Sequence, residues 1–195
     1  MCIIIAERPT LRGERVLLRS PKPDDKADRL RCGRDPEFRR MVGGDTRTNP
    51  PFTAADADDW YSKTAADPLR WVIEFAGRAI GGLHLHSLDE TDRRARFVIG
   101  IFDAACWEQG LGTEATQLLL AYAFDGLRLH RVDLRVLAFN HRAIACYEKC
   151  GFVREGIERE GAFIAGEWQS DVFMSLLEQE YRGLKQGGCD VAAVH

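Results

Sequence analysis

A glycine turn at residues 107–115 contains residue types that could bind a phosphate group. Its sequence is Trp-Glu-Gln-Gly-Leu-Gly-Thr-Glu-Ala, and Gly110 and Gly112 lie between an apolar run at 97–102 and a helix-like run at 113–124. Glycines at a strand-to-helix junction let backbone N–H groups point outward, where the dipole of the following helix favours an anion. The turn therefore predicts a site for a phosphate-bearing ligand.

One interpretation of this turn is a dinucleotide site in an oxidoreductase. The stretch 110–115 satisfies the pattern G-x-G-x-x-G/A, and Asp133 follows at about the expected distance of ~20 residues. In the dinucleotide fold, however, the acid closes the second strand, and the glycine unit usually begins its domain. Asp133 instead opens the strand-like run 132–139, and a long stretch of chain precedes the glycines. A dinucleotide-dependent oxidoreductase is therefore the weakest of the alternatives.

A second segment, Asn140-His-Arg-Ala-Ile-Ala-Cys-Tyr-Glu-Lys-Cys-Gly-Phe152, follows about 30 residues after the glycine turn. Together the two segments resemble the GNAT superfamily of acyl-CoA-dependent N-acyltransferases. Further stretches at 112–115, 129–131 and 166–171 are similar to its ribosomal-protein and polyamine N-acetyltransferase branch. The resemblance covers roughly residues 10–182. It implies an enzyme that uses acetyl-CoA as co-substrate and needs no metal.

The resemblance also implies which residues hold the co-substrate. Backbone N–H groups of the turn would bind the pyrophosphate of coenzyme A, and a side chain on Gly110 or Gly112 would crowd that approach. Many family members have Arg or Gln where this chain has Trp107. The expected cofactor-binding residues are Ile101, Phe102, Gln109, Gly110, Leu111, Gly112, Thr113, Asn140 and Tyr147.

Asn140 and Tyr147 are the expected catalytic residues, and their spacing places them on one face of a helix. By resemblance, the Asn140 amide contacts the pantetheine or phosphate region, although an Asn at this place is also a typical helix N-cap. Tyr147 would lie near the thioester sulfur. A phenol with a pKa near 10 suits a thiolate with a pKa near 8.5 only modestly, so hydrogen bonding in the transition state and full proton transfer are both open. The alternative is that Tyr147 only packs as a partly buried aromatic residue of the helix and has no catalytic role.

The general base is harder to assign, because the stretch 97–99 lacks the glutamate that many superfamily members carry there. His84 and His86 alternate with two leucines on a predicted strand, so both face one side and one of them could deprotonate an ammonium through water. Both histidines also fit the solvent-facing side of a sheet, with no role as a base. Glu74 and Asp103 are weaker candidates for the base.

The acceptor is expected to be a cation, and acidic side chains could steer it toward the site. Asp56, Asp58 and Asp59 cluster on an early predicted helix, and further acids lie near the closing strands at Glu158, Glu160 and Glu167. Each of them also fits a solvated surface charge. We take Asp56 and Asp59, with His84 and His86, as the candidate substrate residues.

These residues must be positioned by an α+β arrangement. The resemblance implies a three-layer α/β/α fold with a mixed, mostly antiparallel central sheet of about seven strands and a βαβ cofactor-binding core. We expect one domain over residues 1–195, with 183–195 as a flexible tail. The expected strands are 11–19, 69–75, 79–88, 95–102, 132–139, 152–160 and 169–177, and the expected helices are 24–34, 53–66, 113–127 and 142–149.

Bulk composition narrows the class of protein. A chain of 195 residues with 45% hydrophobic and 29% charged residues is ordinary for one globular domain. The net charge of −3 gives no nucleic-acid footprint. The six cysteines show neither a C-x-x-C pair nor metal-ligand spacing, and no apolar run approaches a membrane span. We expect a cytoplasmic protein with reduced thiols, without nucleic-acid or membrane partners, as a monomer or homodimer.

The leading prediction is an acetyl-CoA-dependent N-acetyltransferase. Its acceptor would be a primary amine, either a protein N-terminus or a small polyamine or amine. A non-catalytic acyl-CoA-binding protein is the alternative, because the strand glutamate is missing.

Overall fold

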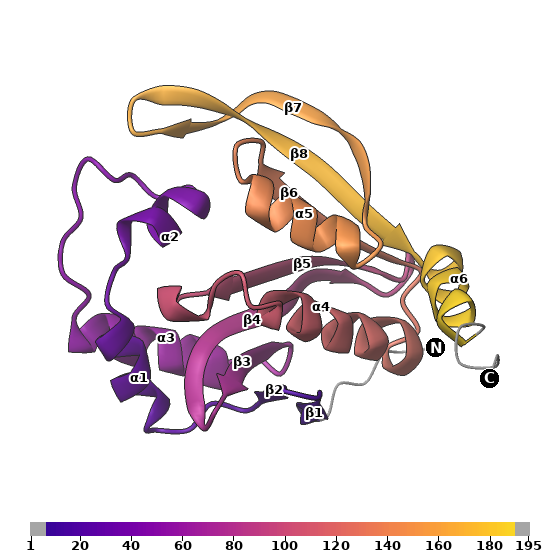
Figure 1. The fold of residues 1–195 in the computed structure, drawn as a ribbon, viewed down its shortest axis with the longest axis horizontal. Coiled ribbons are helices and arrows are strands. Elements are labelled where there is room, and N and C mark those ends of the chain that lie inside the picture. The colour runs from indigo at the N-terminus through magenta and orange to yellow at the C-terminus, as the bar shows by residue number, and fades with distance from the viewer. Residues whose placement is uncertain (1–6, 190–195) are drawn as a thin grey trace.

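A single sheet of eight strands organises the molecule in a computed structural model that describes residues 7–189 (Figure 1). The strand order is β1-β2-β3-β4-β5-β6-β8-β7. Only β5 and β6 pair in parallel; every other neighbouring pair is antiparallel. The mixed, mostly antiparallel sheet is confirmed, with one strand more than expected. The extra strand arises because the run 11–19 is broken by a turn at Gly13, whose N–H bonds back to Val16.

The strands are β1 (Leu11–Arg12), β2 (Val16–Arg19), β3 (Arg70–Phe75), β4 (Arg78–Asp89), β5 (Arg94–Ile101), β6 (Arg131–Leu137), β7 (Val153–Ile164) and β8 (Glu167–Leu177). The α-helices are α1 (Asp25–Cys32), α2 (Pro36–Met41), α3 (Ala54–Ala66), α4 (Leu111–Ala121), α5 (His141–Lys149) and α6 (Glu178–Cys189). None of the helices among residues 7–189 is long and apolar enough to cross a membrane.

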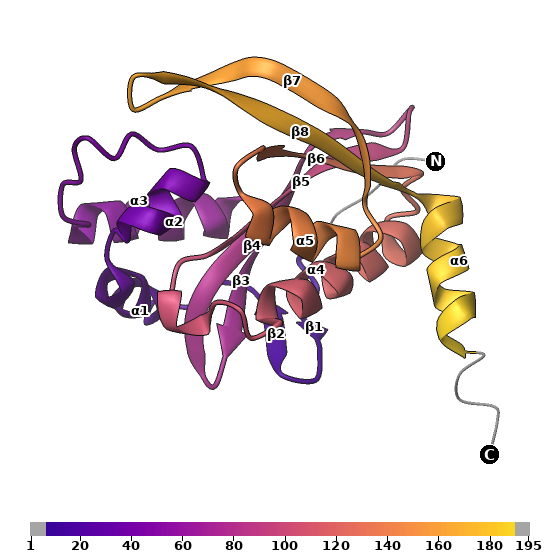
Figure 2. The same cartoon turned by 45° about the horizontal axis from the view of Figure 1, so that its top comes forward.

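The two parallel strands separate soon after they begin. Their register joins only the first three residues of each strand, from Arg94 opposite Arg131 to Arg96 opposite Asp133. The second halves of β5 and β6 do not pair with each other. In sequence, α4 and its connection lie between the two strands. This divergence opens the sheet in its middle (Figure 2).

The main core lies between the sheet and the helices α4 and α5. It contains the inward residues of β2 to β6 and of β8, together with Leu111, Ala115, Leu119 and Phe124 of α4 and the turn after it, and Ile144 of α5. The opposite face is covered at one end by α1 and α3, where Gly82 of β4 lies near the Trp60 ring and Trp60 meets Phe102 edge-on. Helices on both faces give the three-layer arrangement that was expected.

Local sequence explains where the helices begin. Thr53 caps α3 in a reciprocal capping box with Asp56, as the acidic first turn predicts. The short helix α2 was not expected, although Asp35 accepts from Phe38 N and Pro36 occupies the first turn. Both features are typical helix-start signals.

The structure also contains a last helix that the sequence interpretation did not include. Residues 178–189 form α6, so the stretch 183–195 expected as a tail begins within a helix. Its end, 190–195, lies outside the described residues.

Candidate active site

A cavity of about 830 Å³ lies where β5 and β6 separate. Its walls come from α2, the second half of β5, the glycine turn, the end of β6, α5 and the tip of the β7–β8 hairpin. The cavity therefore passes through the plane of the sheet. Helices α4 and α5 flank one end, and α2 and the hairpin flank the other (Figure 2).

The two glycines of the turn have different roles at the cavity wall. Gly110 is the N-cap of α4 and has φ of 77°, in the left-handed region that favours glycine. Gly112 has no such constraint, and a Cβ placed on it would meet only Ile101 Cγ1 at 3.9 Å. The chain thus leaves open space above Gly112, beside the first N–H groups of α4, which have no partner within the helix. A phosphate fits this arrangement of open space and donors.

Six of the nine residues expected to hold the co-substrate line the cavity: Ile101, Gly110, Gly112, Thr113, Asn140 and Tyr147. The side chains of Phe102 and Leu111 do not, because both are buried in packing. Gln109 does not line it either, since its amide donates to Ala105 O at 2.6 Å. The sequence pattern predicts a binding segment here but does not say which of its side chains turn away from the cavity.

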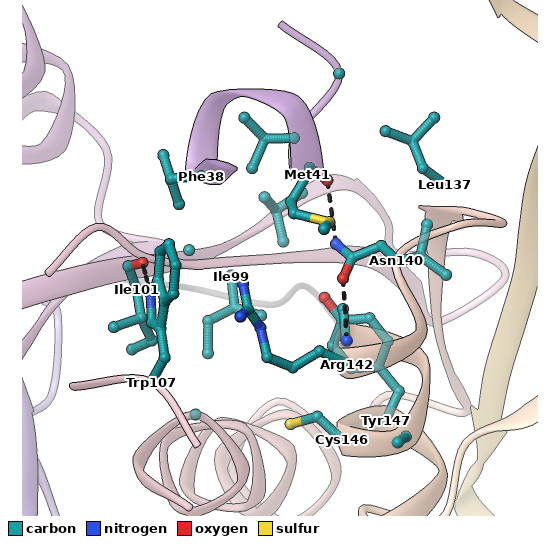
Figure 3. A pocket seen from close by; sticks show the side chains of 18 of the residues that line it. Phe38, Met41, Ile99, Ile101, Trp107, Leu137, Asn140, Arg142, Cys146 and Tyr147 are labelled. Atoms are coloured by element: carbon teal, nitrogen blue, oxygen red, sulfur yellow. Dashed lines mark hydrogen bonds between the residues drawn. The ribbon is translucent and has the colours of Figure 1, made fainter. Parts of the chain in front are cut away.

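Trp107 and Arg142 meet at the edge of the cavity, as Figure 3 shows. The Trp107 indole N–H donates to Ile101 O at 2.8 Å, which fixes the ring against the end of β5. The guanidinium carbon of Arg142 lies 4.3 Å from the centre of that ring, a cation–π contact. Arg142 also pairs with Glu37 of α2 at 3.1 Å. Sequence reasoning missed this basic group, although it lies two residues after Asn140.

Asn140 is the N-cap of α5 and connects that helix to α2. Its Oδ1 accepts from Ala143 N at 3.2 Å, and its Nδ2 donates to Met41 O at 3.1 Å (Figure 3). The N-cap interpretation of this residue is therefore confirmed. Its amide still borders the cavity, so it determines how α2 and α5 face one another across it.

Tyr147 reaches from α5 toward the centre of the cavity (Figure 3). Its ring packs edge-on against Phe97 and Phe152. Burial, followed by the neighbouring thiols of Cys146 and Cys150, raises the pKa of the phenol well above its usual value. The hydroxyl therefore keeps its proton at neutral pH.

Two cysteines of α5 lie beside the start of α4. Cys146 lines the cavity and its Sγ is 3.3 Å from Thr113 Oγ1, while Cys150 Sγ lies 3.7 Å from Thr113 O. A hydrogen bond from Cys150 lowers the pKa of Cys146, and the same bond raises the pKa of Cys150. Neither thiol forms a disulfide among the described residues.

The proposed acceptor-steering residues lie away from the cavity wall. His84 and His86 occupy the face of β4 opposite the main core and do not line the cavity. Burial first, and Arg70 second, lower the pKa of His84 to about 4. Asp56 pairs with Arg34 at 3.1 Å, and Asp59 pairs with Lys63 at 2.7 Å.

The other candidate carboxylates are also engaged elsewhere. Asp58 pairs with Lys26 at 3.0 Å, Glu74 is bonded by Arg19, and Asp103 caps a turn by accepting from Ala105 N. None of these three carboxylates lines the cavity.

The acid of the dinucleotide pattern is likewise remote from the glycine turn. Asp133 lies near the start of β6 and is ion-paired with Arg96 at 2.9 Å and Arg131 at 3.5 Å. It does not line the cavity, so it is not placed to bind a ribose there.

At the far end of the cavity the structure adds a charged pair that sequence reasoning did not select. Arg135 of β6 and Asp171 of β8 both line it, with Arg135 Nη2 and Asp171 Oδ2 2.9 Å apart. Asp171 belongs to the stretch 166–171, which entered the sequence argument only as part of a resemblance. No local signal in that stretch marks Asp171 as buried.

Comparison with known proteins gives a match over most of the chain. Residues 15–153 match the family model described as the acetyltransferase (GNAT) domain. The provisionally named ribosomal N-acetyltransferase YdaF of Bacillus subtilis (strain 168) is 36% identical over 129 residues, which are 65% of this chain and 69% of YdaF. Spermidine N(1)-acetyltransferase of Escherichia coli (strain K12) is 32% identical over 134 residues, 67% of this chain and 72% of the relative.

A solved structure agrees with these sequence matches. The spermidine N-acetyltransferase of Vibrio cholerae in complex with CoA and spermine superposes with a TM-score of 0.72 at 26% identity. The match covers 87% of this chain and 99% of that one.

Proposed function

The chain belongs to the GNAT acetyltransferase family and is an N-acetyltransferase, and we propose that it moves the acetyl group of acetyl-CoA to a primary amine. One observation carries the proposal: the cavity passes through the sheet between β5 and β6, with a glycine turn at one end and a buried carboxylate at the other. Such a passage lets an acyl donor and an acceptor enter from opposite sides.

The residues around the glycine turn fit acetyl-CoA, whose thioester supplies an activated acetyl group. The open space above Gly112 and the free N–H groups at the start of α4 suit a pyrophosphate. Arg142 adds a positive charge at the same edge of the cavity. Glu37 and the Trp107 ring hold the Arg142 side chain in place.

We assign to Tyr147 the role of stabilising the leaving group, the thiolate of coenzyme A. Its phenol holds a proton at neutral pH because burial raises its pKa, so it can donate a hydrogen bond at Oη to a developing thiolate. Phe97 and Phe152 fix the ring edge-on and keep water from its sides. Asn140 supports the site by holding the start of α5 against α2.

The relatives and the charge at the far end of the cavity support the proposed acceptor class. Two matched relatives are named for spermidine and one for a ribosomal substrate, and all of them are N-acetyltransferases. Asp171 gives that end a carboxylate, the group that attracts a cationic amine.

Release of free thiol from acetyl-CoA tests this function. We expect release to depend on both the enzyme and an amine from a panel of spermidine, butylamine and short peptides with free N-termini. Tight binding of acetyl-CoA without thiol release for any amine would identify an acyl-CoA-binding protein instead. Binding of NAD in place of acetyl-CoA would show that the glycine turn serves a dinucleotide.

A further inference from the structure

Three charged side chains form a cluster where the end of β6 lies beside the middle of β8, and β8 lies beside the middle of β7. The cross-strand register puts Asp171 of β8 opposite Leu137 of β6 on one side and opposite Glu158 of β7 on the other. Arg135 bridges the two acids, with Nη1 2.9 Å from Glu158 Oε2 and Nη2 2.9 Å from Asp171 Oδ2. The pairing of β7 is irregular just past this point, between Glu158 and Ala162, and irregular pairing of this kind often re-aims side chains near a site.

Strand alternation puts the cluster on the acceptor side of the sheet. Val136 and Val172, neighbours of Arg135 and Asp171 in sequence, point into the main core below α4 and α5. Successive side chains of a strand face opposite sides, so Arg135 and Asp171 face the other way. The cavity lining thus includes the glycine turn on one face and Asp171 on the other.

Asp171 is buried but not satisfied. The residue is 3% exposed, and its Oδ2, like Glu158 Oε2, accepts no hydrogen bond of normal geometry from the described residues, although an Arg135 nitrogen lies 2.9 Å from each. Of these two oxygens, only that of Asp171 belongs to a residue that lines the cavity. Burial raises the pKa of this carboxyl, and Glu158 adds to that effect against the opposing influence of Arg135. Buried charged oxygens normally have well-aligned hydrogen-bond donors, so a carboxylate on a cavity wall whose ion pair is poorly aligned can accept from a second donor.

Charge balance points to the chemistry of that donor. The cluster contains two carboxylates and one guanidinium, so one negative charge remains when all are ionised. A second cation would balance it. Apolar side chains of Phe38, Met41 and Val98 also line the cavity and suit an alkyl chain.

We propose that Asp171 is the residue that binds the acceptor, pairing with the ammonium group of a primary alkylamine at the end of the cavity opposite the glycine turn. This inference rests on the proposed function and names its specificity residue. Glu158 does not line the cavity and acts only by sharing Arg135. Arg135 competes with the substrate for the carboxylate and limits how tightly the amine binds.

Calorimetric titration of spermidine, and separately of butylamine, into CoA-saturated protein tests the assignment. For Asp171→Asn we expect at least a tenfold rise in the Kd of the amine. The matched control Glu158→Gln removes a carboxylate from the same guanidinium but not from the cavity wall, and we expect a change below threefold. The Kd of acetyl-CoA should stay within twofold in both variants.

If Asp171→Asn fails to fold, a variant that is expected to bind the amine more tightly still tests the assignment. Arg135→Gln releases the Asp171 carboxylate from its competitor, so the amine should bind at least threefold more tightly. A purely structural ion pair predicts unchanged or weaker binding in that variant.

Three results would overturn the inference. These are wild-type affinity for the amine in Asp171→Asn, an equal loss in Glu158→Gln, and no binding of either amine by the wild-type protein. The proposed function fails separately, through absent acetyl-CoA binding or absent thiol release with every acceptor in the panel.

Discussion

Gly110 and Gly112 show that two residues of one motif can be required for different reasons. Gly110 is needed by the backbone, because its φ of 77° is rarely adopted by other residues. We expect Gly112 to be needed by the ligand, because in the free protein a Cβ there would meet nothing closer than 3.9 Å. The glycine pattern in the sequence predicts the turn, but only the structure separates these two requirements.

Replacing Tyr147 with phenylalanine tests its role at the leaving group. We expect Tyr147→Phe to lower kcat by up to ~10²-fold and to leave the Kd of acetyl-CoA unchanged, since the hydroxyl acts on charge that develops only in the transition state. Single-turnover acetylation and calorimetry measure the two quantities. Tyr122→Phe is the control, because Tyr122 packs on Trp71 outside the cavity wall. An unchanged rate constant in Tyr147→Phe would remove this residue from the mechanism.

At the scale of elements, the divergence of β5 and β6 creates the site, and sequence could not have predicted it. The two strands were expected within a few residues of their observed ends, because apolar alternation and the glycine turn mark them. Their separation after Arg96 and Asp133 depends on register between segments far apart in the chain. No local pattern encodes such a register.

The helices show the same limit on what local sequence can predict. The capping box of Thr53 and the N-cap Asn140 could be identified from short-range chemistry. Helix α2 has six residues, too few for a hydrophobic period, so only Asp35 and Pro36 marked it. That helix supplies one wall of the cavity.

Glu114 is expected to stabilise the junction between α4 and the first hairpin. Its Oε1 accepts from Arg15 N at 2.7 Å and Val16 N at 3.1 Å, and its side chain is 17% exposed. Glu114→Ala leaves both donors without this acceptor, so we expect the free energy of unfolding to fall by about 2 kcal/mol. Urea denaturation measures it. Asp59→Ala, which removes an exposed carboxylate, should change it by less than about 0.5 kcal/mol; equal effects would contradict the assigned role of Glu114.

At the scale of the whole molecule, the partly buried His84 predicts how stability depends on pH. The pKa of His84 falls to about 4 on folding, below the value near 6.5 expected for the unfolded chain, so the unfolded state binds more protons between these limits. Stability should be fully present above pH 6.5 and decline as the pH falls toward 4.

The size of this effect is limited by solvent, because His84 is only partly buried. We expect its contribution to be about 1 kcal/mol, well below what the full shift would give without screening. Urea denaturation at a series of pH values measures the decline, and His84→Gln should flatten it. A variant with the same pH dependence as the wild type would show that His84 does not titrate as described.

The whole account depends on the claim that the space above Gly112 receives the phosphates of acetyl-CoA. Titration of acetyl-CoA into folded Gly112→Val tests it most directly, with Gly156→Val as a control, since Gly156 lies on β7 with nothing within 4 Å of an added Cβ. We predict that Gly112→Val weakens binding at least tenfold, about 1.4 kcal/mol, while Gly156→Val binds like the wild type. Wild-type affinity in a folded Gly112→Val protein would contradict the phosphate site and the function built on it.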